Sequence, residues 1–189
     1  MDNNRFTEIT PEIIDLAQKS KDVSYIQPEL YSKYDVKRGL RDVSGKGVLA
    51  GLTNISDVRA HDLVDGVQVP IHGRLFYRGY DVVDLVNGFT SDNRFGFEET
   101  AYLLLFGSLP AKAELIHFSE LLSSYRSLPT SFVRDIIMKA PSKDMMNIPV
   151  RNVLTLYAYD DRADDTSLPN VLRESLQLMS LCSMLSIYG

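Results

Sequence analysis

The residues from Leu168 to Gly189 constrain the fold more than any other part of this 189-residue chain. They predict one long helix that is apolar nearly all round, relieved only by Ser180, Ser183 and Ser186. A helix of this kind has to be buried on most of its sides. No stop signal precedes Gly189. The pattern therefore predicts a helix of the protein interior or of a subunit interface, in a chain that is cut in mid-helix.

Composition places the chain among globular proteins, with 44% apolar and 24% charged residues. A net charge of -5, with scattered lysines and arginines, argues against a nucleic-acid binder. No stretch is long and apolar enough to span a bilayer, and residues 1–10 lack the features of a signal peptide. The single cysteine, Cys182, is expected in the core, and a reducing compartment fits it best. We therefore expect a cytoplasmic protein that binds neither nucleic acid nor membrane.

Three segments of different character divide the chain. Residues 1–37 form an N-terminal extension with short helices, one of which Thr10 caps ahead of Pro11. Residues 38–86 hold nearly all the strand signal together with a short helix, and residues 87–189 are helical throughout. The sequence thus predicts a mainly α, multi-helical fold with a small N-terminal β-hairpin.

The hairpin is expected to occupy most of the second segment. Glycine and β-branched residues predict a first strand within 48–58, and residues 74–78 predict a second. The stretch between Arg59 and His72 is rich in Asp, Gly and Pro, which predicts a long tip. Asp81 is the expected N-cap of the short helix that follows.

Apolar residues spaced three and four apart predict five helices in the third segment. The first, near 97–106, should end at Gly107 in a left-handed conformation. The others are expected near residues 111–126, 131–139 and 149–159 and from Leu168 onward.

No residue pattern of the chain itself predicts catalysis or a metal centre. The glycines between Gly39 and Gly47 do not have the spacing of a phosphate-binding loop. His61 and His72 flank an acidic stretch at a spacing that favours a solvated loop over the alternative, a metal site. We expect His117 to be a partly buried packing residue. The acidic residues at 160–165 lack the glycine and final Glu of a calcium loop, which favours a solvated linker with capping roles.

An ordered set of short segments resembles the amino-terminal signature of citrate synthases. The set opens with Gly39-Leu40-Arg41, and its later members are residues 47–50, 53–56, 73–81 and 97–110. Their order and spacing extend the resemblance over residues 38–189, while the preceding residues resemble an extra segment of some bacterial members.

The resemblance implies the hairpin and the first half of the helical large domain of citrate synthase. This acyltransferase of the tricarboxylic acid cycle condenses oxaloacetate with acetyl-coenzyme A to give citrate and coenzyme A. Its chemistry needs two histidines and an aspartate, which in the family lie beyond the position of Gly189. His61, His72 and His117 match none of them, so no catalytic residue is assigned. The resemblance therefore implies a truncated chain that is inactive alone.

One ligand position carries over from the family. Arg41 matches an arginine that contacts the phosphates of coenzyme A, and the alternative is that it pairs with a nearby acid. Arg78 is expected to be a structural residue of the hairpin. No permanently bound cofactor is implied, because acetyl-coenzyme A is a substrate of the full-length enzyme. The last helices resemble those through which the family forms homodimers.

Departures from the family pattern leave two other functions open. Residues 59–72 exceed the usual link between the strands, and residues 143–150 replace a common histidine-proline-methionine run. Leu181 and Ser183 stand where lysine and proline are frequent. The alternatives are a 2-methylcitrate synthase, which uses propionyl-coenzyme A, and a non-catalytic helical interaction module.

Overall fold

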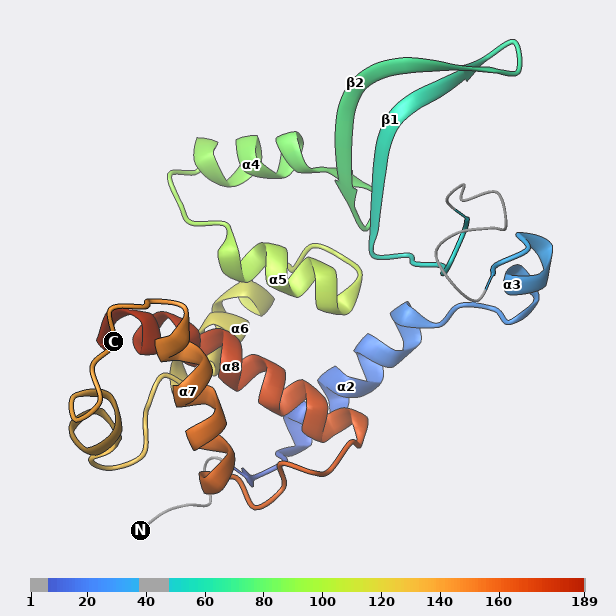
Figure 1. The fold of residues 1–189 in the computed structure, drawn as a ribbon. Coiled ribbons are helices and arrows are strands. Elements are labelled where there is room, and N and C mark those ends of the chain that lie inside the picture. Colours follow the sequence, from blue (N-terminus) through green and yellow to red (C-terminus); the bar gives the residue numbers. More distant parts are fainter. Residues whose placement is uncertain (1–6, 38–47, 189) are drawn as a thin grey trace. The chain divides into compact units, whose positions relative to one another are not determined.

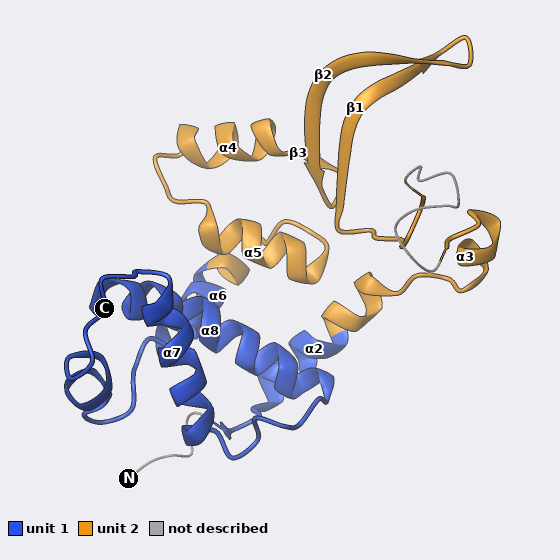
Figure 2. Ribbon diagram, in the orientation of Figure 1, with its two compact units in different colours: residues 1–18, 116–189 blue, residues 19–115 orange. Residues whose placement is uncertain are grey.

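The computed structural model describes residues 7–37 and 48–188, shown in Figure 1. The described residues are mainly helical and include one three-stranded antiparallel sheet, which confirms the predicted fold class. Figure 2 shows two compact units, which we call unit 1 (residues 1–18 and 116–189) and unit 2 (residues 19–115). The division of the chain into three segments at residues 37 and 86 stays a prediction.

The sheet of unit 2 is built around a long two-stranded hairpin. Strands β1 (Ser56–Val64) and β2 (Val67–Tyr77) pair in antiparallel register and are joined by only two residues. Asp65 and Gly66 both have positive φ, 52° and 79°, as a tight hairpin turn with the twist of the strands requires. The predicted long tip between Arg59 and His72 is therefore wrong, because those residues extend the two strands.

The hairpin departs from the prediction at its start as well. The strand that was expected within residues 48–58 begins only at Ser56, and every residue of β1 is exposed. Because neither face of β1 is covered, its sequence lacks the apolar alternation of a half-buried strand. A second tight turn, at Arg78 and Gly79, joins β2 to the short strand β3 (Tyr80–Asp81).

The helices of unit 2 begin and end at the residues that the sequence marks. Asp81 caps α4 (Val82–Ser91) by accepting a hydrogen bond from the backbone N–H of Val83 at 2.9 Å. That hydrogen bond, with a smaller contribution from Arg74, holds the pKa of Asp81 below its usual value. Helix α5 (Phe97–Phe106) ends at Gly107, where φ is 80°. The predicted caps at Asp81 and Gly107 are confirmed.

A buried tyrosine of unit 2 is hydrogen-bonded to two other side chains of the same unit. The hydroxyl of Tyr102, on α5, accepts from Lys19 Nζ at 2.6 Å and donates to Glu114 at 3.0 Å. Lys19 lies on α2 (Pro11–Ser24), and Glu114 lies in the first turn of α6 (Lys112–Ser124). Glu114 also accepts from the backbone N–H of Ala111 at 2.8 Å, and this bond is the main reason why its pKa is lowered.

In unit 1 the first helical cap is also confirmed. The hydroxyl of Thr10 accepts from the backbone N–H of Ile13 at 3.3 Å, and α2 follows with Pro11 as its first residue. In unit 2, Pro28 directly precedes the short helix α3 (Glu29–Lys33).

The prediction of a helix near residues 131–139 is wrong in both its length and its helix type. Only the single π-helical turn η1 (Val133–Ile137) forms there. Ser131 has a φ of 64°, which ends any helical path on the N-terminal side, and Pro141 limits extension on the other. Helix α7 (Asn147–Leu156) starts two residues before its expected position and runs into the 3₁₀ turn η2 (Tyr157–Tyr159).

One hydrophobic cluster of unit 1 forms around the second half of α8 (Leu168–Tyr188). Leu181 and Leu185 pack with Phe132 and Ile137, which come from the irregular segment before α7. The ring of Phe132 lies edge-on to that of Tyr159, with 5.9 Å between ring centroids. The π-helical turn therefore supplies core side chains although it is short.

Helix α8 is buried along one face and exposed along the other, so it is not an interior helix within this chain, and the alternative, a helix of a subunit interface, stays a prediction. Its buried residues recur at helical spacing, as in Leu172, Leu176 and Leu185, while Leu178 and Ile187 are exposed. Cys182, expected in the core, is also exposed, because it lies out of phase with the buried positions. Among the described residues, no helix combines the length and apolarity that a membrane crossing requires.

The end of α5 yields a stability prediction. A Cβ at Gly107 would lie 3.0 Å from Val23 Cβ, and the left-handed backbone alone costs a non-glycine residue about 1–2 kcal/mol. We expect Gly107→Ala to lower the free energy of unfolding by at least about 1 kcal/mol in urea denaturation.

The matched control is Gly88→Ala in the interior of α4. A Cβ there meets nothing within 4 Å, and alanine favours a helix over glycine, so stability should rise by about 0.5–1 kcal/mol. Equal urea midpoints for the two variants would contradict the role assigned to Gly107.

Candidate functional site

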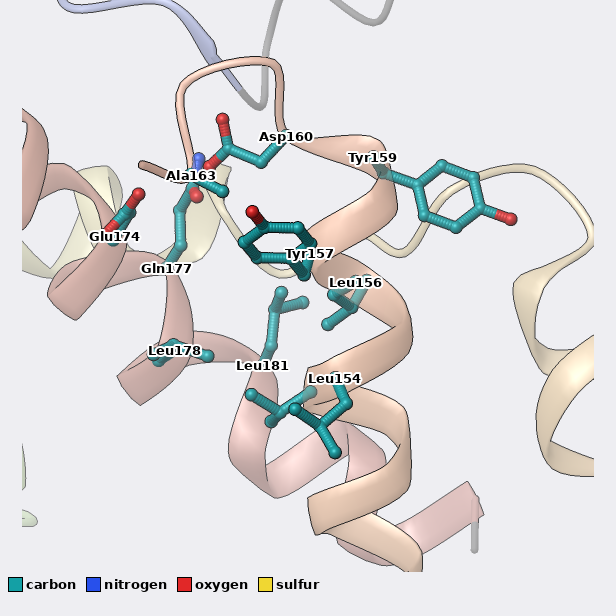
Figure 3. A pocket seen from close by; sticks show the side chains of 11 residues that line it. Leu154, Leu156, Tyr157, Tyr159, Asp160, Ala163, Glu174, Gln177, Leu178 and Leu181 are labelled. Atoms are coloured by element: carbon teal, nitrogen blue, oxygen red, sulfur yellow. The ribbon is translucent and has the colours of Figure 1, made fainter. Parts of the chain in front are cut away.

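A cavity of about 210 Å³ lies in unit 1 where α7, η2 and α8 meet, and we call it the α7–α8 cavity (Figure 3). Leucines form one end of it, among them Leu154 from α7 and Leu178 and Leu181 from α8. Apolar walls of this kind suit the hydrocarbon part of a ligand or of another protein segment.

The other end of the α7–α8 cavity is polar. Asp160, Glu174 and Gln177 lie there, and the ring of Tyr157 stands between them and the leucines (Figure 3). The hydroxyl of Tyr157 donates to both carboxylate oxygens of Asp164 at 2.9 Å, and this bond raises the pKa of Tyr157. The tyrosine is therefore held as a phenol that is already hydrogen-bonded.

Behind the polar end lies a fully buried arginine, which the sequence analysis did not single out. The side chain of Arg173 is 0% exposed, and its Nη2 donates to Asp160 Oδ2 and to Asn170 Oδ1, both at 2.7 Å. Its Nη1 donates to Gln177 Oε1 at 2.9 Å. A buried guanidinium is tolerated only when it is paired and hydrogen-bonded, and these partners satisfy both conditions.

The arginine and Asn170 together fix the acidic linker between η2 and α8. Asn170 is 0% exposed, and its Nδ2 donates to the carbonyls of Arg162 at 2.9 Å and Asp165 at 2.8 Å. Within the linker the carboxylate of Asp165 accepts from the backbone N–H of Ser167 at 2.9 Å, which forms a turn just before α8 begins at Leu168, so the predicted capping role of the linker acids stays a prediction. The hydrogen bond from Ser167 is the main cause of the lowered pKa of Asp165.

Asp160 has a second role that sequence reasoning missed. It was expected in a solvated linker, but its side chain is only 14% exposed and pairs with Arg173. A signal was available, because Asn170, Arg173 and Gln177 are three polar residues at helical spacing within an apolar helix. Polar residues on the buried face of a helix imply a partner inside the protein.

Each of the three histidines lies at an exposed position. His61 lies on β1 and His72 on β2, both exposed and in strands instead of the expected loop. The expectation that His117 is partly buried is wrong, because its side chain is 66% exposed and its Nε2 lies 2.8 Å from Glu12 Oε1. In the part of the chain that the structure describes, no group of three or more His, Cys, Asp or Glu side chains could hold a metal ion.

The family resemblance drew attention to Arg41 and Arg78, and the structure describes only Arg78. Arg41 belongs to residues 38–47, which lie outside the described residues. Arg78 has a φ of 48°, and its guanidinium reaches the carbonyl of Leu104 at 2.9 Å and that of Val23 at 3.1 Å. It also donates to Asn54 Oδ1 at 2.7 Å. These bonds agree with the expectation that Arg78 is structural, and burial lowers its pKa.

The Arg173 network yields a second stability prediction. Replacing this residue by Met should destabilise the chain by about 3–5 kcal/mol, because Asp160 would keep its charge in a nearly buried position without a partner. Urea unfolding followed by circular dichroism measures the loss.

Arg162→Met is the matched control in the same linker. Its guanidinium pairs with Asp165 at 4.0 Å and is half-exposed, so its loss should cost at most about 1 kcal/mol. If both variants lost the same stability, the buried pair would not be what fixes the linker.

Comparison with known proteins provides a family match. Residues 40–188 match the family model described as citrate synthase, C-terminal domain. The chain is 29% identical over 164 residues to a 2-methylcitrate synthase of Mycobacterium tuberculosis, covering 87% of this chain and 36% of that protein. It is 32% identical over 132 residues to a citrate synthase of Haloferax volcanii, covering 69% and 29%.

A shorter match is 40% identical over 68 residues to a 2-methylcitrate synthase of Shewanella oneidensis, covering 36% of this chain and 16% of that protein. The chain thus spans about 16–36% of the length of these three curated relatives.

Proposed function

Because this chain belongs to the citrate synthase family, we propose that it supplies the hairpin and the first half of the large helical domain of a condensing enzyme. The reaction proposed for that enzyme joins oxaloacetate to acetyl-coenzyme A and releases citrate and coenzyme A. The observation that carries the proposal is the match of residues 40–188 to the family, together with the confirmed mainly α fold.

The proposal leaves open which acyl-coenzyme A the enzyme uses. Relatives of the chain are named both citrate synthase and 2-methylcitrate synthase. We keep acetyl-coenzyme A as the first candidate and propionyl-coenzyme A as the second. The two differ by one methylene, and a pocket that discriminates between them gains about 1–3 kcal/mol.

These 189 residues are proposed to be inactive on their own. The chemistry needs a histidine that polarises the oxaloacetate carbonyl and an aspartate that removes a proton from the thioester, both within reach of the substrates. His61 and His72 are exposed on the hairpin, and His117 pairs with Glu12 at an exposed surface. None of the three lines the α7–α8 cavity.

The proposed contribution of this chain to ligand binding is Arg41, as a contact for the phosphates of coenzyme A. A guanidinium suits this role because its fork of N–H groups matches phosphate oxygens.

We also propose that unit 1 forms a homodimer through α7 and α8. An exposed apolar stripe follows α7 at spacings of four, four and three residues through Met146, Val150, Leu154 and Tyr157. The exposed face of α8 adds Val171 and Leu178. Exposed apolar residues in such number mark an interaction site, and a second copy of the chain presents the same residues.

The non-catalytic interaction module is the remaining candidate, and the same apolar stripe is what favours it. The coding sequence after codon 189 discriminates the two. An open frame with histidine-bearing motifs supports the enzyme, and a stop codon supports the module.

The proposed inactivity is tested by release of free thiol. With oxaloacetate and either acetyl- or propionyl-coenzyme A, the 189-residue chain should give no more thiol than a protein-free blank. A gene product of the length of the relatives should release thiol, faster with its preferred thioester. Turnover by the 189-residue chain itself would contradict the assignment of the chemistry to other residues.

Sedimentation tests the proposed dimer. The chain should sediment as a dimer at high concentration, and Leu154→Glu should shift it to a monomer, because 70% of this leucine is exposed on the stripe. The control is Val83→Glu on α4, an equally apolar and exposed position outside the stripe, which should leave the dimer intact. A wild-type chain that stays monomeric at all concentrations would contradict the interface.

A further inference from the structure

A second cavity, of about 360 Å³, lies in unit 2 at the base of the hairpin. Residues 53–57 form one wall of it, and Arg59, Phe76, Arg78 and Gly79 form the rest. We call it the hairpin-base cavity. The proposed condensation assigns it no role, and its lining is more polar than that of the α7–α8 cavity.

Positive charge exceeds negative charge on the walls of the hairpin-base cavity. Two arginines, Arg59 and Arg78, and one carboxylate, Asp57, line it, which gives a formal charge of +1. The acceptors that the structure shows for Arg78 are neutral, namely carbonyls, an amide oxygen and the hydroxyl of Ser24. The carbonyls of Val23 and Leu104 belong to helix ends, which carry only partial negative charge.

A third arginine lies next to this cavity on the same face of the sheet. Arg59 of β1 and Arg74 of β2 are directly opposite in the register. Both guanidiniums lie against the ring of Phe76, with their central carbons 4.7 and 4.8 Å from its centroid. Arg74 is paired with Asp81 at 2.7 Å. Like charges directly opposite each other destabilise a hairpin, and an anion near them relieves that repulsion.

The guanidinium of Arg59 can donate further hydrogen bonds. Its Nε donates to Asp57 Oδ2 at 2.7 Å, and within the described ranges no hydrogen bond occupies its two terminal nitrogens. These two nitrogens form the fork that binds two oxygens of one carboxylate or phosphate.

Two hydroxyls extend the set of donors. Thr53 Oγ1 accepts from the backbone N–H of Ile55 at 3.1 Å, which leaves its proton available to donate, and Ser56 lies on the same wall. Of the side-chain acceptors on the walls, Asn54 Oδ1 accepts from Arg78 and Asp57 Oδ2 accepts from Arg59, which leaves Oδ1 of Asp57 as the remaining carboxylate oxygen. The unused polar groups are thus mainly donors.

We propose that the hairpin-base cavity binds a phosphate-bearing anion, held by the terminal nitrogens of Arg59 and by the hydroxyls of Thr53 and Ser56. Phosphate fits this set better than a carboxylate because it presents three or four acceptor oxygens instead of two. The volume accommodates a phosphate or diphosphate group, either as the free inorganic anion or as part of a nucleotide.

Calorimetric titration of the 189-residue chain at low salt tests the proposal with two probes, inorganic pyrophosphate and ADP. We expect saturable binding of at least one, weakened tenfold or more by Arg59→Gln and several-fold by Ser56→Ala. Arg59→Lys should give an intermediate loss, because lysine keeps the charge without the fork. Circular dichroism confirms that each variant is folded.

The matched control is Arg134→Gln, which removes an exposed arginine that is likewise paired with a neighbouring acid, Asp135. It should leave both titrations unchanged within about twofold, as expected for a residue outside the site. Binding of pyrophosphate assigns the free anion as a sufficient ligand, and binding of ADP alone assigns a nucleotide. Absence of binding by both probes, or equal losses in Arg59→Gln and Arg134→Gln, would overturn the proposal. The readout needs no turnover, so it is independent of the proposed condensation.

Discussion

The guanidinium of Arg173 is a positive charge inside an apolar helix, and the arrangement of unit 1 depends on how that charge is satisfied. Asp160 neutralises it, and the side chains of Asn170 and Gln177 accept its remaining hydrogen bonds. These contacts hold the acidic linker against the start of α8, which orients the helix so that its leucines meet the core around Phe132. One face of α8 is thereby buried, and the opposite face, with apolar residues such as Val171 and Leu178, is exposed.

Arg78 has a comparable organising role in unit 2, but without a carboxylate. Its left-handed backbone makes the tight turn between β2 and β3, and its side chain reaches carbonyls in the last turns of α2 and α5. A cation is stabilised there by the unpaired carbonyls of the helix ends. Arg78 therefore fixes the base of the hairpin to the helices, together with Asn54, whose Nδ2 donates to the carbonyl of Val23 at 2.8 Å, while the strands beyond remain largely exposed. This combination leaves the positively charged cavity beside Arg59.

Helix caps could be predicted from the sequence. The buried face of a helix, and contacts between residues distant in the chain, could not. The caps at Thr10, Asp81 and Gly107 each need only their neighbours in the chain, and all three are confirmed. The two-residue hairpin turn was missed although it is an Asp-Gly pair, because polar residues in strands without a buried face resemble a loop. Cys182 was misplaced because an apolar run does not reveal which side of the helix is covered. Of the candidate site, the apolar walls could be anticipated from the sequence, but the buried ion pair could not, because it joins residues thirteen positions apart across a turn.

The central claim is that the exposed face of α8 belongs to an interface between two copies of the chain. Cys182 reports on it directly, because it is the single cysteine of the sequence and lies exposed on that helix. The rate at which this thiol reacts with an aromatic disulfide reagent should be measured over a wide range of protein concentration. The reaction should be fast in dilute solution and should slow markedly as the copies associate. A rate constant that is independent of concentration, with the chain remaining folded, would contradict it.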